Sequence, residues 1–267
     1  MVNTNPFIAQ PPNEVPLQNA PLIRVIAQVL FPSILSMEDK EFVRVFQEAI
    51  RENYPYLQPE QTQGFVFSPQ GVVPTVPQIT WRFVDKTETW RVSLAPNFLA
   101  LETTVYSSRS DFLERLESLL IALKESFHPN IDIIERFGMR YIDRLVGQNI
   151  DDLSSLVKPE IAGIATAGFR EYIHQNINQS LFIIPDGGEQ IIARWGLVPA
   201  DTTFDPAAIE PFAESSWILD LDMSLSKKRD FSVETLMNEA KQFSERIYTF
   251  FRWAVTDEFL RRFGGEL

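Results

Sequence analysis

The chain has 267 residues, of which 45% are hydrophobic and 22% are charged, a composition typical of a globular protein with a substantial core. Its 24 basic and 36 acidic residues give a net charge of −12, which repels a phosphate backbone and disfavours nucleic-acid binding. The absence of cysteine excludes disulfides, thiolate metal sites and cysteine nucleophiles. The N-terminus lacks the basic start and apolar core of a signal peptide, and no apolar run reaches the roughly 20 residues that span a bilayer, so we expect a cytoplasmic protein without membrane contact.

The first half of the chain predicts strands and helices in alternation. Residues 1–20 are rich in proline and are expected to form an extended arm. A β-branched run over 22–31 predicts a strand. A helix capped by Ser36 is expected next, and a second helix capped by Ser110 is expected over 111–127. The apolar face expected for the first helix consists of Phe42, Val45, Phe46 and Ile50. Between the helices, after a loop at Pro59, four strands are predicted at 64–68, 78–85, 87–95 and 98–106, with a proline-rich turn over 69–77.

The second half begins with the stretch 131–147, IDIIERFGMRYIDRLVG. Its periodicity fits either a strand or a helix, and its density of isoleucine and aromatic residues around Gly138 favours a strand. Residues 151–175 are expected to be helical with an interruption at Pro159. Strands follow over 180–185, 189–198 and 215–225, and a long helix capped by Ser232 runs over 233–263. The first two of these strands are joined by a predicted hairpin turn at 185–188.

The two halves present their elements in the same order. Each reads as a strand, a helix, three or four short strands and a helix, so we predict an α+β fold in which two pseudo-repeated halves form one curved antiparallel sheet with helices on one side. The expected divisions are an arm over 1–20, a first half over 21–130 and a second half over 131–267 within one compact unit. This order of elements resembles the TATA-binding-protein-like fold, and the resemblance concerns architecture, since a fold does not specify an activity.

Three segments carry a further resemblance. NAPLIRVIAQVLFP at 19–32, RFGMRYIDRL at 136–145, and the LDLD strand at 219–222 followed by a helix with IYTFFRWAVTDEF are similar to a sporadically distributed family of uncharacterised bacterial proteins. Many members have a Leu-His pair in the last helix, and Met237-Asn238 stands at that place here. The resemblance implies no activity, and the scattered distribution suggests accessory genes such as those of phage defence.

The candidate catalytic and metal-binding residues are few. His128 fits a cap after a helix, His174 is expected to be exposed, and neither has a second histidine at metal-ligand spacing. Asp220 and Asp222 alternate with leucines, so both carboxylates share one strand face and could hold a divalent cation, with Glu102 as a companion. The simpler interpretation is a solvated face paired to basic residues. No phosphate-binding loop or serine nucleophile elbow is present.

The best binding candidate is the arginine face of the central stretch. Arg136, Arg140 and Arg144 share one face of a strand and, with Arg24 on the matching strand of the first half, predict a basic patch for an anionic ligand or an acidic partner. The competing interpretation is internal pairing with Glu135, Asp143, Glu102 or the Asp220 and Asp222 pair. The apolar residues of the last helix cover more than one stripe, so this helix is expected to lie in the core or to form a homodimer contact.

These observations lead to one leading hypothesis for function. We expect a non-catalytic binding or adaptor protein without a cofactor, which recognises a protein partner or a small anionic ligand. The alternatives are a metal-dependent hydrolase or nuclease that uses Asp220 and Asp222, and nucleic-acid binding on the concave face of the sheet.

Overall fold

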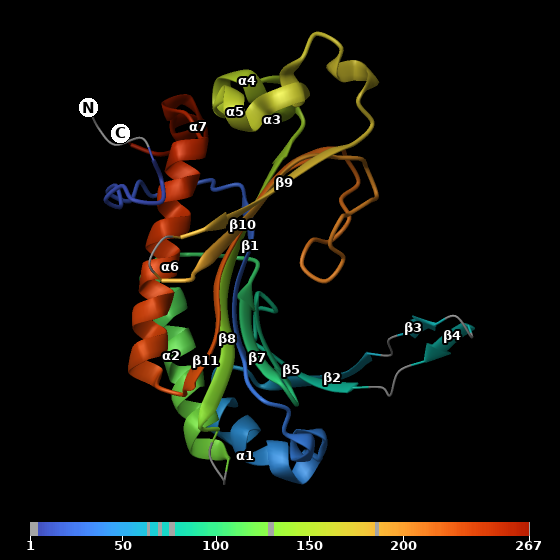
Figure 1. Ribbon diagram of the computed structural model, residues 1–267, viewed down its shortest axis with the longest axis vertical. Helices are drawn as coiled ribbons and strands as arrows, with labels where there is room; N and C mark the ends of the chain where they lie inside the picture. Colours follow the sequence, from blue (N-terminus) through green and yellow to red (C-terminus); the bar gives the residue numbers. More distant parts are fainter. Residues whose placement is uncertain are drawn as a thin grey trace. The chain divides into compact units, whose positions relative to one another are not determined.

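A computed structural model describes residues 5–62, 65–68, 71–74, 78–127, 131–184 and 187–266 (Figure 1). The fold is α+β, as predicted, and nine strands form one open antiparallel sheet in the order β2-β5-β6-β7-β1-β8-β11-β10-β9. The chain packs as two compact units. The first unit consists of residues 1–25, 139–225 and 241–267, and the second consists of residues 26–138 and 226–240.

The elements up to residue 126 are β1 (Leu22–Leu30), the 3-10 helix η1 (Leu35–Glu38), α1 (Lys40–Ile50), β2 (Tyr56–Thr62), β3 (Phe65–Ser68), β4 (Gly71–Pro74), β5 (Gln78–Val84), β6 (Trp90–Ala95), β7 (Phe98–Thr103) and α2 (Arg109–Ser126). The remaining elements are β8 (Ile133–Val146), α3 (Gln148–Asp151), α4 (Leu153–Leu156), α5 (Pro159–Ala162), the 3-10 helices η2 (Gly163–Thr166) and η3 (Arg170–Tyr172), β9 (Asn176–Ile183), β10 (Gln190–Val198), β11 (Ser216–Asp230), α6 (Val233–Ala254) and α7 (Asp257–Arg262).

The second unit has a core between its strands and the helices α1 and α2. Alternate residues of β5 and β6 are buried, as the sequence pattern predicts, among them Trp81 and Phe83. The ring of Phe46 on α1 lies 5.7 Å from that of Phe83, and Phe112 on α2 lies 5.7 Å from Trp90. The helices of this unit therefore cover the apolar face of its strands.

The predicted caps of both helices in this unit were wrong. Helix α1 is capped by Asp39, whose side chain accepts a hydrogen bond from the backbone N–H of Glu41, because a 3-10 turn occupies the four residues before it. On this helix Val43 is buried and Val45 is exposed, so the predicted apolar face was wrong at Val45. Helix α2 is capped by Ser108, two residues before the predicted cap, because Ser108 has an extended backbone and its hydroxyl accepts from the N–H of Asp111.

Two strands were missed because prolines suggested turns. The predicted loop at Pro59 is the strand β2, which pairs with β5 in an antiparallel register that sets Pro59 opposite Trp81. The predicted proline-rich turn contains β4, which pairs with β3 in a separate two-stranded sheet. An edge strand tolerates proline because one side of its backbone has no partner. Pro59 was therefore not evidence against a strand at this edge of the sheet.

The second half of the chain begins with a strand, as favoured, since β8 extends over fourteen residues. The predicted helical segment 151–175 follows the short helix α3 and consists instead of two single-turn α-helices and two 3-10 turns, because Pro159 starts a new turn and Gly163 adopts a positive φ angle. The strand β11 continues to Asp230, so Lys227 and Lys228 lie on it. The pairing of β9 with β10 confirms the predicted hairpin, whereas Pro185 and Asp186 of its turn and the predicted cap at His128 lie outside the described residues.

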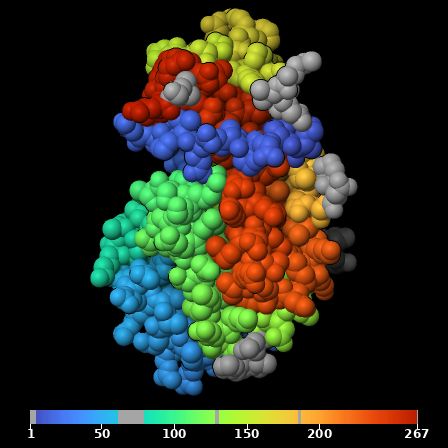
Figure 2. All heavy atoms as spheres, turned by 90° about the vertical axis from the view of Figure 1, so that its left-hand side faces the viewer, coloured from blue at the N-terminus to red at the C-terminus, as the bar shows by residue number. Residues whose placement is uncertain are grey.

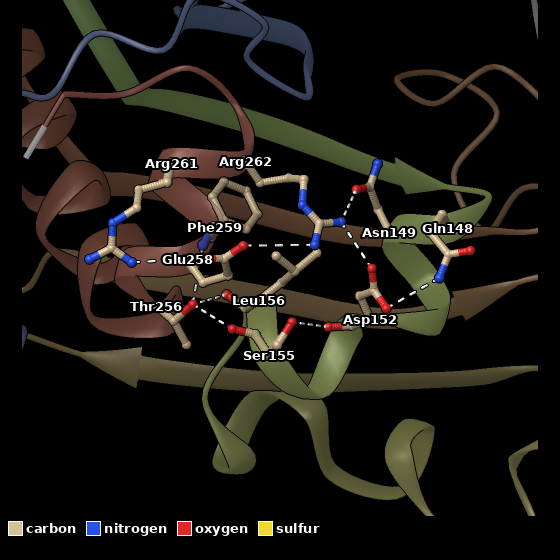
Figure 3. Close-up of polar contacts among 10 residues, drawn as sticks. All are labelled: Gln148, Asn149, Asp152, Ser155, Leu156, Thr256, Glu258, Phe259, Arg261 and Arg262. Atoms are coloured by element: carbon tan, nitrogen blue, oxygen red, sulfur yellow. Dashed lines mark hydrogen bonds and ion pairs between the residues drawn. The ribbon is translucent and has the colours of Figure 1, made fainter.

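The long C-terminal helix is divided into two. Ser232 caps α6 as predicted, through a hydrogen bond from the N–H of Thr235, but α6 ends at Ala254. Thr256 caps α7, and its hydroxyl and backbone N–H also donate hydrogen bonds to carbonyl oxygens of α4 (Figure 3). Arg262 on α7 bonds Asp152 and Asn149 in the same network. The break in the helix thus lets α7 dock on the short helices α3 and α4.

The N-terminal arm lies across the C-terminal helices of the first unit, where Figure 2 shows it as a blue band beside the red C-terminal residues. Arg246 donates hydrogen bonds to the carbonyl oxygens of Pro6 and Ala9, and the hydroxyl of Tyr248 accepts one from the N–H of Val15. The ring of Phe7 lies 4.7 Å from Phe182 and 5.8 Å from Phe250. The arm therefore covers part of α6 with residues of the same chain.

Candidate functional site

The arginine face of β8 is built by strand alternation. Phe137, Met139 and Leu145 are buried on one face, and Arg140 and Arg144 project from the other, which we call the polar face. On β10 and β11 the same face carries Arg194 and Asp220, which stand directly opposite each other in the antiparallel register. Four strands of the first unit therefore contribute to one charged surface, with Arg24 from β1 as the remaining predicted member.

Asp220 is the centre of a closed ionic group, the Asp220 cluster, which consists of Arg140, Arg194, Asp205 and Asp220. The Asp220 side chain is fully buried and accepts two hydrogen bonds from Arg140, at 2.7 and 2.8 Å, and one from Arg194 at 3.1 Å. Arg140 also contacts Asp205 at 2.8 Å. Two positive and two negative charges cancel, so this group is internally neutral.

The geometry of the Asp220 cluster favours a structural role. Burial works against the charged form of Arg140, but the hydrogen bonds and charges of Asp220 and Asp205 outweigh it, and the pKa of Arg140 is raised. A buried carboxylate that keeps two guanidinium partners is costly to separate from them, because either charge alone would be left without compensation. The competing interpretation made from the sequence, internal pairing with the aspartates, is therefore correct for Arg140.

Arg24 and Arg144 form a second group, which we call the arginine pair. Arg24 contacts the carboxylate of Glu210 at 2.9 Å, and Arg144 donates a hydrogen bond of 2.6 Å to the backbone carbonyl of Glu210. The guanidinium of Arg144 lies 5.1 Å from the ring centroid of Phe212. Arg24 is thus joined to a carboxylate, whereas Arg144 is joined to a neutral carbonyl and an aromatic ring.

Within the arginine pair, the charge of Arg144 is poorly compensated. The side chain of Arg24 is only 8% exposed, whereas that of Glu210 is 78% exposed to solvent. Burial lowers the pKa of Arg144, and the positive charge of Arg24 acts in the same direction, against the opposing effect of Glu210. The buried Nε of Arg144 has no hydrogen-bond partner among the described residues. Arg144 can therefore donate a hydrogen bond to a further anionic or carbonyl oxygen.

The partners of these arginines come from the loop 199–215 between β10 and β11, the orange loop in Figure 1. The loop is anchored by Ala208 and Ile209, which are buried, and by turns in which the carbonyl oxygen of Asp205 accepts from the N–H groups of both residues. Asp201 has a φ of 57°, which is uncommon for a residue other than glycine. Asp205 and Glu210 thus reach the polar face from an ordered loop.

Arg136, the third predicted arginine of β8, belongs to the second unit. It lies 3.4 Å from the side-chain oxygen of Gln28. Its guanidinium occupies the space over Gly138, where a Cβ atom would lie 2.9 Å from both terminal nitrogens. Gly138 therefore has a packing role that explains a glycine within this strand.

The predicted metal-binding pair, Asp220 and Asp222, is not part of a metal site among the described residues. Asp220 is occupied by two arginines, and the described residues contain no group of three or more His, Asp or Glu side chains that could hold a metal ion. Glu102, the predicted companion, forms an ion pair with Arg91 on the neighbouring strand β6. His174 is exposed, as expected.

Three residues of the site were not identified from sequence. Arg194 follows the alternation of β10, so pairing β10 with β11 would have placed it beside Asp220. Asp205 and Glu210 carry no such signal, because they lie in a loop whose path depends on tertiary contacts.

Comparison with known proteins gave no match to any family model and none to a curated protein. No helix in the described ranges combines the length and apolar character needed to cross a membrane.

Proposed function

We propose that the protein is a non-catalytic binding or adaptor protein whose arginine pair recognises a carboxylate-bearing segment of a protein partner. One observation carries the proposal: the guanidinium of Arg144 bonds a neutral backbone carbonyl and lies near the charge of Arg24, so its own charge is poorly compensated. The Asp220 cluster holds the strands beneath and keeps its own charges paired. Arg24 and Arg144 are then the residues that bind the partner's carboxylate-bearing segment.

The loop contacts suggest the form of the ligand. The segment from Glu210 to Phe212 offers Arg24 a carboxylate, offers Arg144 a backbone carbonyl, and lays an aromatic ring beside the same guanidinium. A peptide can supply all three groups, whereas a small inorganic anion supplies only the first. The carboxylate of Glu210 is 78% exposed to solvent, so a ligand carboxylate can exchange with it.

The small anionic ligand remains the second candidate, favoured by the unpartnered Nε of Arg144 among the described residues. A metal-dependent hydrolase ranks lower because a cation at Asp220 would have to displace both Arg140 and Arg194. Nucleic-acid binding ranks lower because of the net charge of −12.

Peptide binding by fluorescence anisotropy tests the proposal. The probe is a labelled peptide with the sequence of residues 207–214, AAIEPFAE, and the control peptide has glutamine in place of its first glutamate. The loop competes within the molecule at an effective concentration on the order of millimolar, so Glu210→Gln should bind the peptide more tightly than the natural chain. Glu214→Gln, which removes an exposed acid of the same loop, is the matched control.

Removal of both arginines should weaken binding of the labelled peptide. The double variant Arg24→Ala, Arg144→Ala should lose the peptide while keeping its thermal melting transition, and Arg51→Ala, at an exposed arginine, should not. Displacement of the bound peptide by inorganic phosphate would favour the small anionic ligand. Equal binding by Glu210→Gln and the natural chain, or unchanged binding by the double variant, would reject the arginine pair as the site.

We propose that the two halves arose by duplication and bend one sheet, supported by the shared order of a strand, short helices, successive antiparallel strands and a long helix in each half. We also propose that the chain belongs to the uncharacterised bacterial family that it resembles and acts in an accessory or phage-defence operon. Co-purification of the natural complex would test the role by identifying the partner.

A further inference from the structure

The strand β9 has an unusual edge. It is the last strand of the nine-stranded sheet, and its eight residues, NINQSLFI, include no charge and no proline. Leu181 and Ile183 are 56% and 62% exposed. Within the described part of the chain, no segment forms a backbone hydrogen bond to the outer edge of β9.

The direction of its backbone groups follows from the hairpin. The N–H of Ile184 donates to the carbonyl of Glu189, so alternation makes Phe182 and Ser180 the residues that bond β10. Gln179, Leu181 and Ile183 therefore direct their N–H and C=O groups outward. The same three residues have exposed side chains, so apolar surface and unpaired backbone groups coincide on one edge.

The opposite edge of the sheet is protected. Strand β2 contains Pro59, which lacks a donor, and Glu60, which forms an ion pair with Arg82. Proline and charge are common means of preventing one edge strand from pairing with another. Strand β9 has neither, which indicates that its edge is used for pairing.

We propose that the outer edge of β9 pairs antiparallel with β9 of a second copy of this chain, so that a twofold axis joins the two sheets. Self-pairing sets only uncharged residues opposite each other: with the axis at Ser180, Ile177 faces Ile183 and Gln179 faces Leu181. In a chain with a net charge of −12, an uncharged strand brings two copies together without like charges in register. An isologous contact of this kind closes the assembly as a dimer.

This interface differs from the predicted dimer contact through the last helix, part of whose surface is covered by the arm. It is also independent of the arginine pair, so either proposal can fail alone. The edge strand thus adds a self-association site to the proposed binding protein.

Sedimentation velocity over a wide range of protein concentration tests the proposal. The full chain should form a reversible dimer, and Leu181→Lys should be monomeric with an unchanged circular dichroism spectrum. Ile183→Lys is the second variant, in case the first fails to fold. Leu35→Lys, at an apolar residue that is 76% exposed in η1, is the control and should remain dimeric.

Amide hydrogen exchange provides a readout of the strand itself. Exchange at Gln179 and Leu181 should slow as protein concentration rises, because these N–H groups become bonded only in the dimer. A chain that stays monomeric at every concentration would overturn the proposal. So would a dimer that persists in folded Leu181→Lys or Ile183→Lys.

Discussion

Asp143 on β8 is a buried acid whose removal should change how stability depends on pH. It is 6% exposed, and burial raises its pKa from the ordinary 3.8 to about 7. The folded state therefore binds this proton more tightly than the unfolded state does. Its contribution is most favourable below about pH 4, where both states are protonated, and is lost as pH rises through about 7.

The magnitude follows from the size of the pKa change. Each tenfold change in an ionisation equilibrium corresponds to about 1.4 kcal/mol, so the rise from 3.8 to about 7 corresponds to about 4 kcal/mol. Asp143→Asn is neutral at every pH and avoids this cost. Relative to the natural chain, the variant should gain about 4 kcal/mol in free energy of unfolding between acidic and mildly alkaline pH.

The assay is urea unfolding followed by tryptophan fluorescence at a series of pH values. The buried amide of the variant adds a cost that does not vary with pH. The test is therefore how the difference in free energy of unfolding between the variant and the natural chain changes with pH. Asp152→Asn is a control of opposite sign, because hydrogen bonds from Arg262 and Gln148 lower the pKa of Asp152 and stabilise the natural chain above its unfolded pKa. If the difference in free energy of unfolding between Asp143→Asn and the natural chain does not change with pH, the reasoning is refuted.

Three further predictions concern stability and use urea unfolding at neutral pH. Asp220→Asn should lower the free energy of unfolding by about 3 kcal/mol, because it leaves buried guanidinium charge under-compensated. A decrease no larger than that of Glu214→Gln would contradict this. Gly196→Ala should be severely destabilising, because Gly196 has a φ of 147° and its Cβ would lie 1.7 Å from a backbone oxygen, whereas Gly168→Ala meets nothing within 4 Å and should be nearly neutral. Thr256→Ala should cost about 1 kcal/mol through loss of the cap, and an unchanged unfolding midpoint would count against that role.

Local sequence patterns were enough to predict the class of fold and most of its elements. Alternation identified β5 and β6, and the dense isoleucine and aromatic residues around Gly138 favoured the strand that β8 forms. These patterns are local, because a strand that buries one face must repeat every second residue. Caps and breaks were less predictable, since Ser36 and Asp39, or Ser108 and Ser110, are equally good capping residues, and backbone geometry chooses between them.

Tertiary structure decided the meaning of the arginine face. The sequence placed Arg140 and Arg144 on one side of a strand but left their partners open between internal acids and an external ligand. Which alternative holds depends on the path of the loop 199–215, which brings Asp205 to Arg140 and Glu210 to Arg24 from far along the chain. Loop paths are set by long-range packing, here by burial of Ala208 and Ile209, and no local periodicity encodes them. The same contacts pair Arg140 with two carboxylates and join Arg144 to a neutral backbone carbonyl.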